Sequence, residues 1–197
     1  MTIVNLTEGS TVYTSNVYYV TGTWKSMQDV STLIDSGMDP GIISYLHNAW
    51  TGVGKRKVDQ IILTHNHYDH AGMVKALKTE FHPIVLAWSK NHEGVDKLVR
   101  DGEMLQVADA VFEVIHMPGH STDSILLFNR EEGVLFAGDS PLDIKTEEGH
   151  YGKGFIQVLE RLSRLPVKSI YFGHGKPMFE GCLEMLRRSL LNVKAIS

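Results

Sequence analysis

Three histidines and one aspartate lie within six positions of this chain, in the segment from Thr64 to His70 (THNHYDH). The apolar run from Val58 to Thr64 leads into this segment, and we expect that run to be a short strand. A strand end that continues into a tight loop can turn alternate side chains toward one point. We therefore expect His65 and His67 to share one metal ion, with Asp69 and His70 facing a second.

Three further motifs place a histidine or an aspartate beside a glycine, each after a run that we expect to be a strand. They are Pro118-Gly119-His120-Ser121, Gly138-Asp139-Ser140 and Gly173-His174-Gly175. Glycine lacks a side chain and lets the backbone pass close to a crowded centre. Each motif alone is typical of a turn or a helix cap, but all three in this order indicate one metal centre. The candidate metal ligands are His65, His67, Asp69, His70, His120, Asp139 and His174.

Short runs of strand and helix character alternate along the whole chain. Expected strands cover Thr11–Val20, Val30–Asp35, Val58–Thr64, Ile84–Ala87, Val111–Ile115, Ile125–Phe128, Val134–Ala137 and Ser169–Phe172. Expected helices follow Asp39-Pro40, pass through Met73 to Leu77, cover Val95–Arg100, and carry the apolar stripes Phe155–Leu165 and Phe179–Val193. No repeat or linker interrupts the 197 residues, so we expect one domain over residues 1–197, in the α/β class.

With this order of motifs, the chain resembles the metallo-β-lactamase superfamily along nearly its whole length. The hallmark of that family is a His-x-His-x-Asp-His cluster, then a lone His, a lone Asp and a last His, each at a strand end. Every one of those positions is filled here. The resemblance implies a four-layer αββα sandwich, with two β-sheets, helices outside them and a site at one edge. It also implies the ligands of each ion: His65, His67 and His120 for the first, Asp69, His70 and His174 for the second, and Asp139 for both.

The donor set indicates what the metal ions would do. Five imidazoles and two carboxylates suit two divalent ions, zinc first and iron or manganese as alternatives. Two ions about 3.5–4 Å apart can hold a hydroxide between them and clamp the attacking and leaving oxygens. They lower the pKa of bound water to about 7, which makes hydroxide available at neutral pH. We expect Asp69 to orient this hydroxide and to take up a proton, and we predict a metal-dependent hydrolase.

The substrate class is narrowed by comparison with branches of the resembling family. The complete ligand set with Asp139 looks like the glyoxalase II, lactonase and processing-ribonuclease branches, because the β-lactamases generally lack that bridging aspartate. Glyoxalase II carries Gly-Cys-Gly-Arg soon after it and a C-terminal extension that binds glutathione, whereas this chain has Ser140-Pro141-Leu142-Asp143 and ends at Ser197. Lactonases carry a tyrosine where Leu142 stands, and the ribonucleases add an arm for tRNA. We expect a hydrolase of a small ester, thioester or lactone, with a phosphodiesterase or ribonuclease of the same fold as one alternative.

The main alternative is an oxidoreductase. His65, His120 and Asp139 alone would form the triad of two histidines and one carboxylate that non-haem iron oxygenases use. Persulfide dioxygenases of the resembling superfamily work with a single iron in this way, and they keep the same histidine cluster. They also carry the Gly-Cys-Gly-Arg stretch that this chain lacks, which favours the hydrolase.

Two loops are candidates for substrate contact. The segment from Thr21 to Asp29 contains Trp24, and the resembling family often uses that hairpin as a flap over the metals. Trp24 would clamp an apolar substrate there or, equally well, plug an edge of the core. The long loop from Pro141 to Gly154 follows Asp139 and contains Tyr151. Tyr151 would donate a hydrogen bond to a developing oxyanion or simply face solvent.

Composition argues against several classes of partner. The net charge is −4 with neutral histidines, and no stretch concentrates lysine or arginine, so we expect no nucleic acid. No apolar run is long enough to cross a bilayer, and the opening residues lack a secretory pattern, so we expect no membrane partner. The single cysteine, Cys182, rules out an internal disulfide and favours the cytoplasm. We expect a small-molecule substrate, and the sequence leaves the oligomeric state open.

Overall fold

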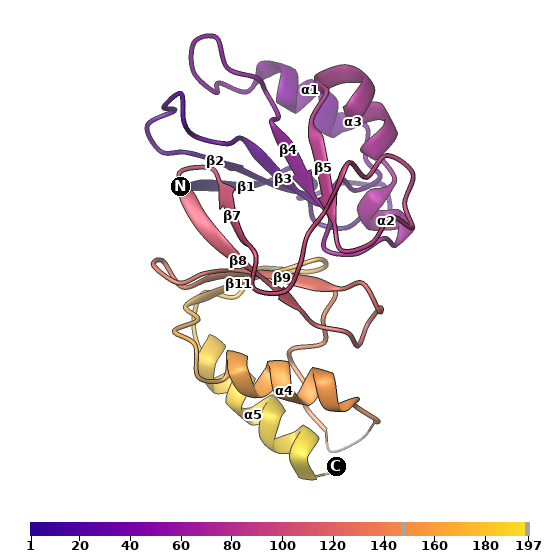
Figure 1. The fold of residues 1–197 in the computed structure, drawn as a ribbon, viewed down its shortest axis with the longest axis vertical. Coiled ribbons are helices and arrows are strands. Elements are labelled where there is room, and N and C mark those ends of the chain that lie inside the picture. The colour runs from indigo at the N-terminus through magenta and orange to yellow at the C-terminus, as the bar shows by residue number, and fades with distance from the viewer. Residues whose placement is uncertain (147–148, 196–197) are drawn as a thin grey trace. The chain divides into compact units, whose positions relative to one another are not determined.

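The fold is built on two β-sheets, one of six strands and one of five. The computed structural model describes residues 1–146 and 149–195, and Figure 1 traces the chain from indigo at the N-terminus to yellow at the C-terminus. Contacts between residues divide the chain into two units, Met1–Val99 with Met104–Phe112, and Arg100–Glu103 with Glu113–Ser197. The expectation of a single domain over residues 1–197 stays a prediction.

The first sheet has the strand order β1-β2-β3-β4-β5-β6. Its strands are β1 (Thr2–Asn5), β2 (Tyr18–Thr21), β3 (Thr32–Ile34), β4 (Gln60–Ile62), β5 (Ile84–Ala87) and β6 (Lys97–Leu98). β1, β2 and β3 pair antiparallel, whereas β3, β4, β5 and β6 pair parallel. Parallel strands need crossover connections, and two of these hold α1 (Gly41–Asn48), α2 (Tyr68–Ala71) and α3 (Val74–Phe81).

Helices α1 and α3 pack on this sheet through apolar side chains spaced at helical intervals. Ile42 and Leu46 of α1 and Leu77 of α3 share one buried cluster with Ile61 of β4 and Val85 of β5. Burial of these side chains fixes the strand ends from which the histidine cluster begins.

The second sheet has the strand order β11-β10-β9-β8-β7. Its strands are β7 (Met104–Val107), β8 (Ala110–His116), β9 (Ile125–Asn129), β10 (Val134–Gly138) and β11 (Ser169–Phe172). The last two helices are α4 (Lys153–Leu162) and α5 (Cys182–Ala195). They join this sheet through a buried cluster that includes Leu126, Leu135, Phe155, Leu159 and Leu186.

The helix expected over Val95–Arg100 is wrong. Gly94 enters this stretch with φ +103°, and the chain then pairs with the edge of β5 as the short strand β6. Val99 is buried while Leu98 is exposed, so the apolar residues alternate between faces, as strand residues do.

The strand expected over Thr11–Val20 is shorter and shifted, since only Tyr18–Thr21 forms β2. The residues before it bond to loops instead of to a neighbouring strand. The Thr7 hydroxyl donates to the Ser15 carbonyl over 2.9 Å, and the Ser15 N–H donates to the Asp69 carbonyl over 3.1 Å. These local bonds compete with a β-ladder.

Within residues 1–146 and 149–195, no helix has both the length and the apolar character needed to span a bilayer.

Candidate metal centre

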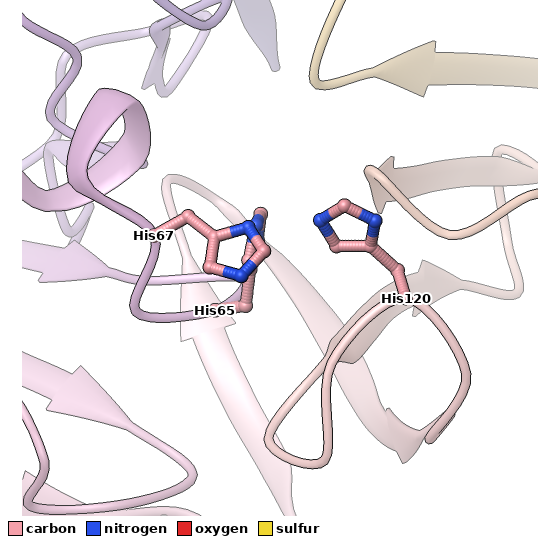
Figure 2. Close-up of side chains that lie close together, drawn as sticks. All are labelled: His65, His67 and His120. Carbon is pink, nitrogen blue, oxygen red and sulfur yellow. The ribbon is translucent and has the colours of Figure 1, made fainter.

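The histidine cluster of the first unit occupies the turn between β4 and α2. β4 ends at Ile62, and the backbone passes through an extended His67 into the first turn of α2. His65 is 2% exposed and His70 is 0% exposed, and the His65 ring centroid lies 4.5 Å from that of His67 and 4.1 Å from that of His70. Figure 2 shows the rings of His65 and His67 beside each other on this segment. Asp69 Oδ2 lies 3.8 Å from His70 Nε2, so the structure brings these four predicted residues together.

A buried aspartate that sequence reasoning missed, Asp35, sets the orientation of this cluster. The Thr64 N–H and hydroxyl donate to Asp35 Oδ1 and Oδ2 over 2.7 and 2.8 Å. His70 Nδ1–H donates to Asp35 Oδ2 over 2.8 Å, so a neutral His70 keeps its lone pair on Nε2. Because the Thr64 hydroxyl proton is already directed to Asp35, its oxygen accepts from His65 Nδ1–H over 3.1 Å. Both imidazoles thus adopt the tautomer that binds a cation through Nε2.

The position of Asp35 follows from strand direction. Asp35 comes directly after β3, which runs parallel to β4, so Asp35 and His65 lie at the same edge of the sheet. Asp35 has φ +62°, a left-handed conformation that aspartate tolerates better than most residues. The N–H groups of Ser36 and Gly37 then donate to the His70 carbonyl over 2.7 and 3.1 Å. The sequence signal was a polar residue at the end of the run Val30–Asp35, which we interpreted only as the last residue of a strand.

Three predicted ligands of the second unit converge for a similar reason. β8 and β10 are both antiparallel to β9, and β10 is parallel to β11. The carboxyl ends of β8, β10 and β11 therefore lie at one edge of the sheet, and His120, Asp139 and His174 follow these ends. His120 stands on the loop after β8 (Figure 2). The three side chains line a hollow of about 240 Å³ together with Gly138, Ser140 and Phe172.

Distances within this hollow fit metal ligands better than direct hydrogen bonds. Asp139 Oδ2 lies 3.6 Å from His120 Nε2 and 3.5 Å from His174 Nε2. Two donors bound to one tetrahedral zinc ion at about 2.0–2.2 Å lie about 3.3–3.6 Å apart, whereas an N–H···O hydrogen bond spans about 2.9 Å. The 3.8 Å between Asp69 Oδ2 and His70 Nε2 in the first unit is close to the same spacing. The donors present in each unit therefore fit a divalent metal ion.

The loop that carries His120 depends on a close approach of backbone to an aromatic ring. A Cβ added at Gly119 would lie 2.8 Å from the Phe155 ring, so only glycine lets this loop pack on α4. Phe155 also stacks against Tyr151, and the centroids of the two rings lie 5.1 Å apart. Tyr151 is half-buried and is not among the described residues that line the hollow. Glu147 and Glu148 of the same long loop lie outside the described residues.

Trp24 lies far from the histidine cluster in the first unit. The loop between β2 and β3 leads into the N-terminal end of β3, while His65 follows the C-terminal end of the parallel strand β4. At about 3.3 Å per residue, the stretch from Val30 to Asp35 separates the two by about 16 Å, and Figure 1 shows this loop and α2 at opposite ends of the sheet. Trp24 is 87% exposed, so it does not plug the core, and this position does not support the flap expected for it.

The lone cysteine is a buried apolar group and no nucleophile. Cys182 is buried at the start of α5, and its thiol donates to the carbonyl oxygen of Lys168 over 3.3 Å. Burial raises the pKa of the Cys182 thiol, which keeps it protonated and unreactive near neutral pH.

The chain is similar in sequence to known hydrolases. The sequence profile of the Metallo-beta-lactamase superfamily matches residues 10–174. A hydroxyacylglutathione hydrolase of Bdellovibrio bacteriovorus is 28% identical over 156 residues, which cover 74% of this chain and 60% of that protein. The atrochrysone carboxyl ACP thioesterase of Aspergillus fumigatus is 30% identical over 146 residues, which cover 73% of this chain and 46% of that protein. This chain therefore spans about half of the length of the curated relatives that it matches.

A solved structure shows the same fold. The crystal structure of TTHA1623 in a di-iron-bound form is 24% identical, with a TM-score of 0.68, and the match covers 96% of this chain and 98% of that one. At this identity, the likeness concerns the fold alone. The expected fold class is confirmed, since the chain is an α/β protein with two sheets, α1 and α3 on the first and α4 and α5 on the second.

Proposed function

Because this chain belongs to the metallo-beta-lactamase superfamily, we propose that it is a metal-dependent hydrolase that cleaves a small thioester, ester or lactone. Two divalent ions would serve the reaction, zinc first and iron or manganese as alternatives, since imidazole and carboxylate donors suit all three. One observation carries the proposal above all. The Asp139 carboxylate lies beside two imidazoles, 3.6 and 3.5 Å from their nitrogens, at the spacing of ligands that share a cation.

The proposed ligand assignment follows the order of the motifs. We assign one ion to His65, His67 and His120, the other ion to Asp69, His70 and His174, and Asp139 to both. Four of these donors come from the turn before and within α2, and three come from the strand ends of the second unit. Distances within each unit support this assignment. Donor atoms of Asp69 and His70 lie at the spacing of metal ligands in the first unit, and those of Asp139 lie at this spacing from His120 and His174 in the second.

The chain's own residues would orient the donors and move the proton. When bound, the divalent ions supply a nucleophile from water at neutral pH. Asp35 and Thr64 hold His70 and His65 in the tautomers that present Nε2. The Asp69 carboxylate, in the first turn of α2, orients the attacking water and takes up its proton.

A thioester is the first substrate class to test. One matching relative is named a thioesterase and another a hydrolase of hydroxyacylglutathione. This chain has Ser140 to Asp143 where the glutathione enzyme carries Gly-Cys-Gly-Arg, so we propose that it recognises the acyl thioester group and not glutathione. We further propose that the substrate is a small molecule of the cytoplasm, a compartment that suits a chain with one cysteine.

Metal analysis separates the hydrolase from the alternative with a single iron. We would measure metal content by elemental analysis and then test thioesters, lactones and phosphodiesters, and a persulfide with oxygen uptake, on the same sample. We expect close to two ions per chain and thioester hydrolysis. His174→Ala should lose the second ion and most of the hydrolysis. The control His47→Ala should keep two ions and full hydrolysis, because His47 pairs with Glu80 on exposed helix surface. One iron per chain with oxygen consumption on persulfide would reverse the proposal.

A further inference from the structure

Two loops of the first unit lie side by side at the end of the sheet away from the histidine cluster. They are residues 22–29, between β2 and β3, and residues 49–57, between α1 and β4. The Lys55 ammonium joins them, since it donates to the carbonyl oxygens of Ser26 and Asp29, both over 2.7 Å. Figure 1 shows both loops reaching beyond the strands. We call these two segments the docking loops.

The docking loops expose a cluster of large apolar side chains. Trp24 is 87% exposed, Val53 is 83% exposed, Met27 is 69% exposed and Trp50 is 68% exposed. Single exposed apolar residues are ordinary on a protein surface, but four on two touching loops form a patch that marks an interaction site. Tyr45 of α1 extends the patch, because Tyr45 and Trp50 line one hollow of about 480 Å³.

The docking loops carry four cationic side chains, of which one is exposed and three are half-buried. The four cationic side chains are Lys25, Lys55, Arg56 and Lys57. Their nitrogens donate to hydroxyl or backbone carbonyl oxygens. The one carboxylate within the docking loops is that of Asp29, which is buried and accepts from the N–H and hydroxyl of Ser26. Four cations against one carboxylate give the docking loops a net positive charge.

Exposed tryptophans on loops of net positive charge fit the headgroup region of an anionic bilayer. Tryptophan favours the boundary between apolar and polar phases, and lysine and arginine are attracted to anionic lipid. We propose that the docking loops bind the protein to the surface of membranes rich in anionic lipid, without crossing them. The expectation of no membrane partner rested on the lack of a spanning segment, and surface docking would overturn it.

Other occupants fit this surface less well. A second copy on a two-fold axis would bring two sets of these cations together, and like charges repel. A protein partner would form its strongest contacts in well-packed pockets, whereas Trp24 and Val53 project with little contact to the rest of the chain.

Vesicle binding of the full chain tests the proposal. We would sediment it with vesicles of equal parts phosphatidylcholine and phosphatidylglycerol, and with phosphatidylcholine alone, and record tryptophan quenching by brominated lipid. We expect binding and quenching only with the anionic vesicles. Trp24→Ala with Val53→Ala should weaken binding about tenfold, and Lys25→Gln with Arg56→Gln roughly twentyfold. Leu191→Ala, at an exposed position of α5, is the control for the apolar variant. Lys75→Gln, at an exposed position of α3, is the control for the charge variant. Both controls should bind vesicles like the unaltered protein.

Three outcomes would overturn the proposal. The first is no sedimentation of the unaltered protein with either vesicle. The second is a loss of binding in the charge variant but not in the apolar variant, which means adsorption without contact of the tryptophan tips. The third is a mass that rises with protein concentration and depends on Trp24, without vesicle binding, which means self-association. Circular dichroism and thioesterase activity of each variant report folding separately from docking.

Discussion

At Asp35, two carboxylate oxygens accept three hydrogen bonds, from the N–H and hydroxyl of Thr64 and from His70 Nδ1–H. In Asp35→Asn, an amide donor replaces one acceptor, so at least one of these bonds is lost. Partners behind a metal ligand typically contribute 10- to 100-fold to affinity, and we expect metal affinity to fall by roughly that factor. Competition with a chromophoric chelator measures it. Asp59→Asn is the matched control, because Asp59 accepts from Ser31 at the other end of the sheet; equal affinity of both variants would contradict the role of Asp35.

Asp69 is the residue whose proposed role is most directly chemical. Asp69→Asn keeps the size of the side chain but removes the acceptor of the proton, so we expect turnover at full metal loading to fall roughly 10²- to 10⁴-fold. Steady-state kinetics on the best thioester, with metal content measured on the same sample, checks this. Asp143→Asn serves as a control for a surface carboxylate paired with Arg188. Near-normal turnover of a fully loaded Asp69→Asn protein would refute the role.

The predictability of the site differs between residues for a physical reason. The four donors from His65 to His70 were predictable because they lie within one turn, and the family resemblance that they carry is confirmed. His120, Asp139 and His174 were predictable as strand-end residues, and the structure gathers them at one sheet edge. Asp35 was missed because its partner, His70, is 35 positions away. The place of Trp24 was not predictable, because the direction of β3 decides which end of the sheet its loop occupies, and the sequence of a single strand does not show its direction.

At the scale of elements, the contact between the β8–β9 loop and α4 positions His120. Gly119→Ala would place a Cβ 2.8 Å from the Phe155 ring, so the loop must move, and we expect a loss of about 1–3 kcal/mol in stability together with weaker metal binding. Urea unfolding and chelator competition measure the two effects. Gly152→Ala is the matched control, because nothing lies within 4 Å of a Cβ there. If both variants bind metal equally, the packing of Gly119 does not matter for His120.

Asp96 ties α3 and β5 to the segment that enters β6. The Lys78 ammonium donates to Asp96 Oδ1 over 2.6 Å, and the Val85 N–H donates to Asp96 Oδ2 over 2.9 Å. The hydrogen bond from Lys78 is the main cause that lowers the pKa of Asp96. A lowered folded pKa stabilises the fold above the unfolded value near 4, and this stability is lost as the pH falls through the folded pKa. Asp96→Asn should therefore destabilise the fold near neutral pH, by less than about 1 kcal/mol because solvent screens this partly exposed pair. Urea unfolding should show a difference that shrinks as the pH falls below the unfolded value near 4. An equal difference at neutral and acid pH would contradict this origin.

Elements that form through their own apolar periodicity were predictable, and elements that form only by pairing were not. α1, α3, α4 and the central strands bury regular stripes, and they form where those stripes lie. β6 covers only Lys97–Leu98, and its strand form comes from the neighbouring edge of β5. β1 was missed because its residues are half-buried or exposed and its structure depends on β2. Contacts with distant parts of the chain override local preference in both cases.

For the whole molecule, the proposed function makes stability depend on metal. The seven proposed ligands would bind metal only in the folded chain, so bound metal would stabilise the fold. An ion at about 1,000 times its dissociation constant adds about 4 kcal/mol, which raises the melting temperature of a chain of this size by roughly 8–16 °C. Calorimetry with and without a chelator measures this shift. His174→Ala should lose most of the shift and His47→Ala should keep it. If a chelator strips the metal without changing the melting temperature, the seven residues do not act as one ligand set, and the proposed hydrolase loses its structural basis.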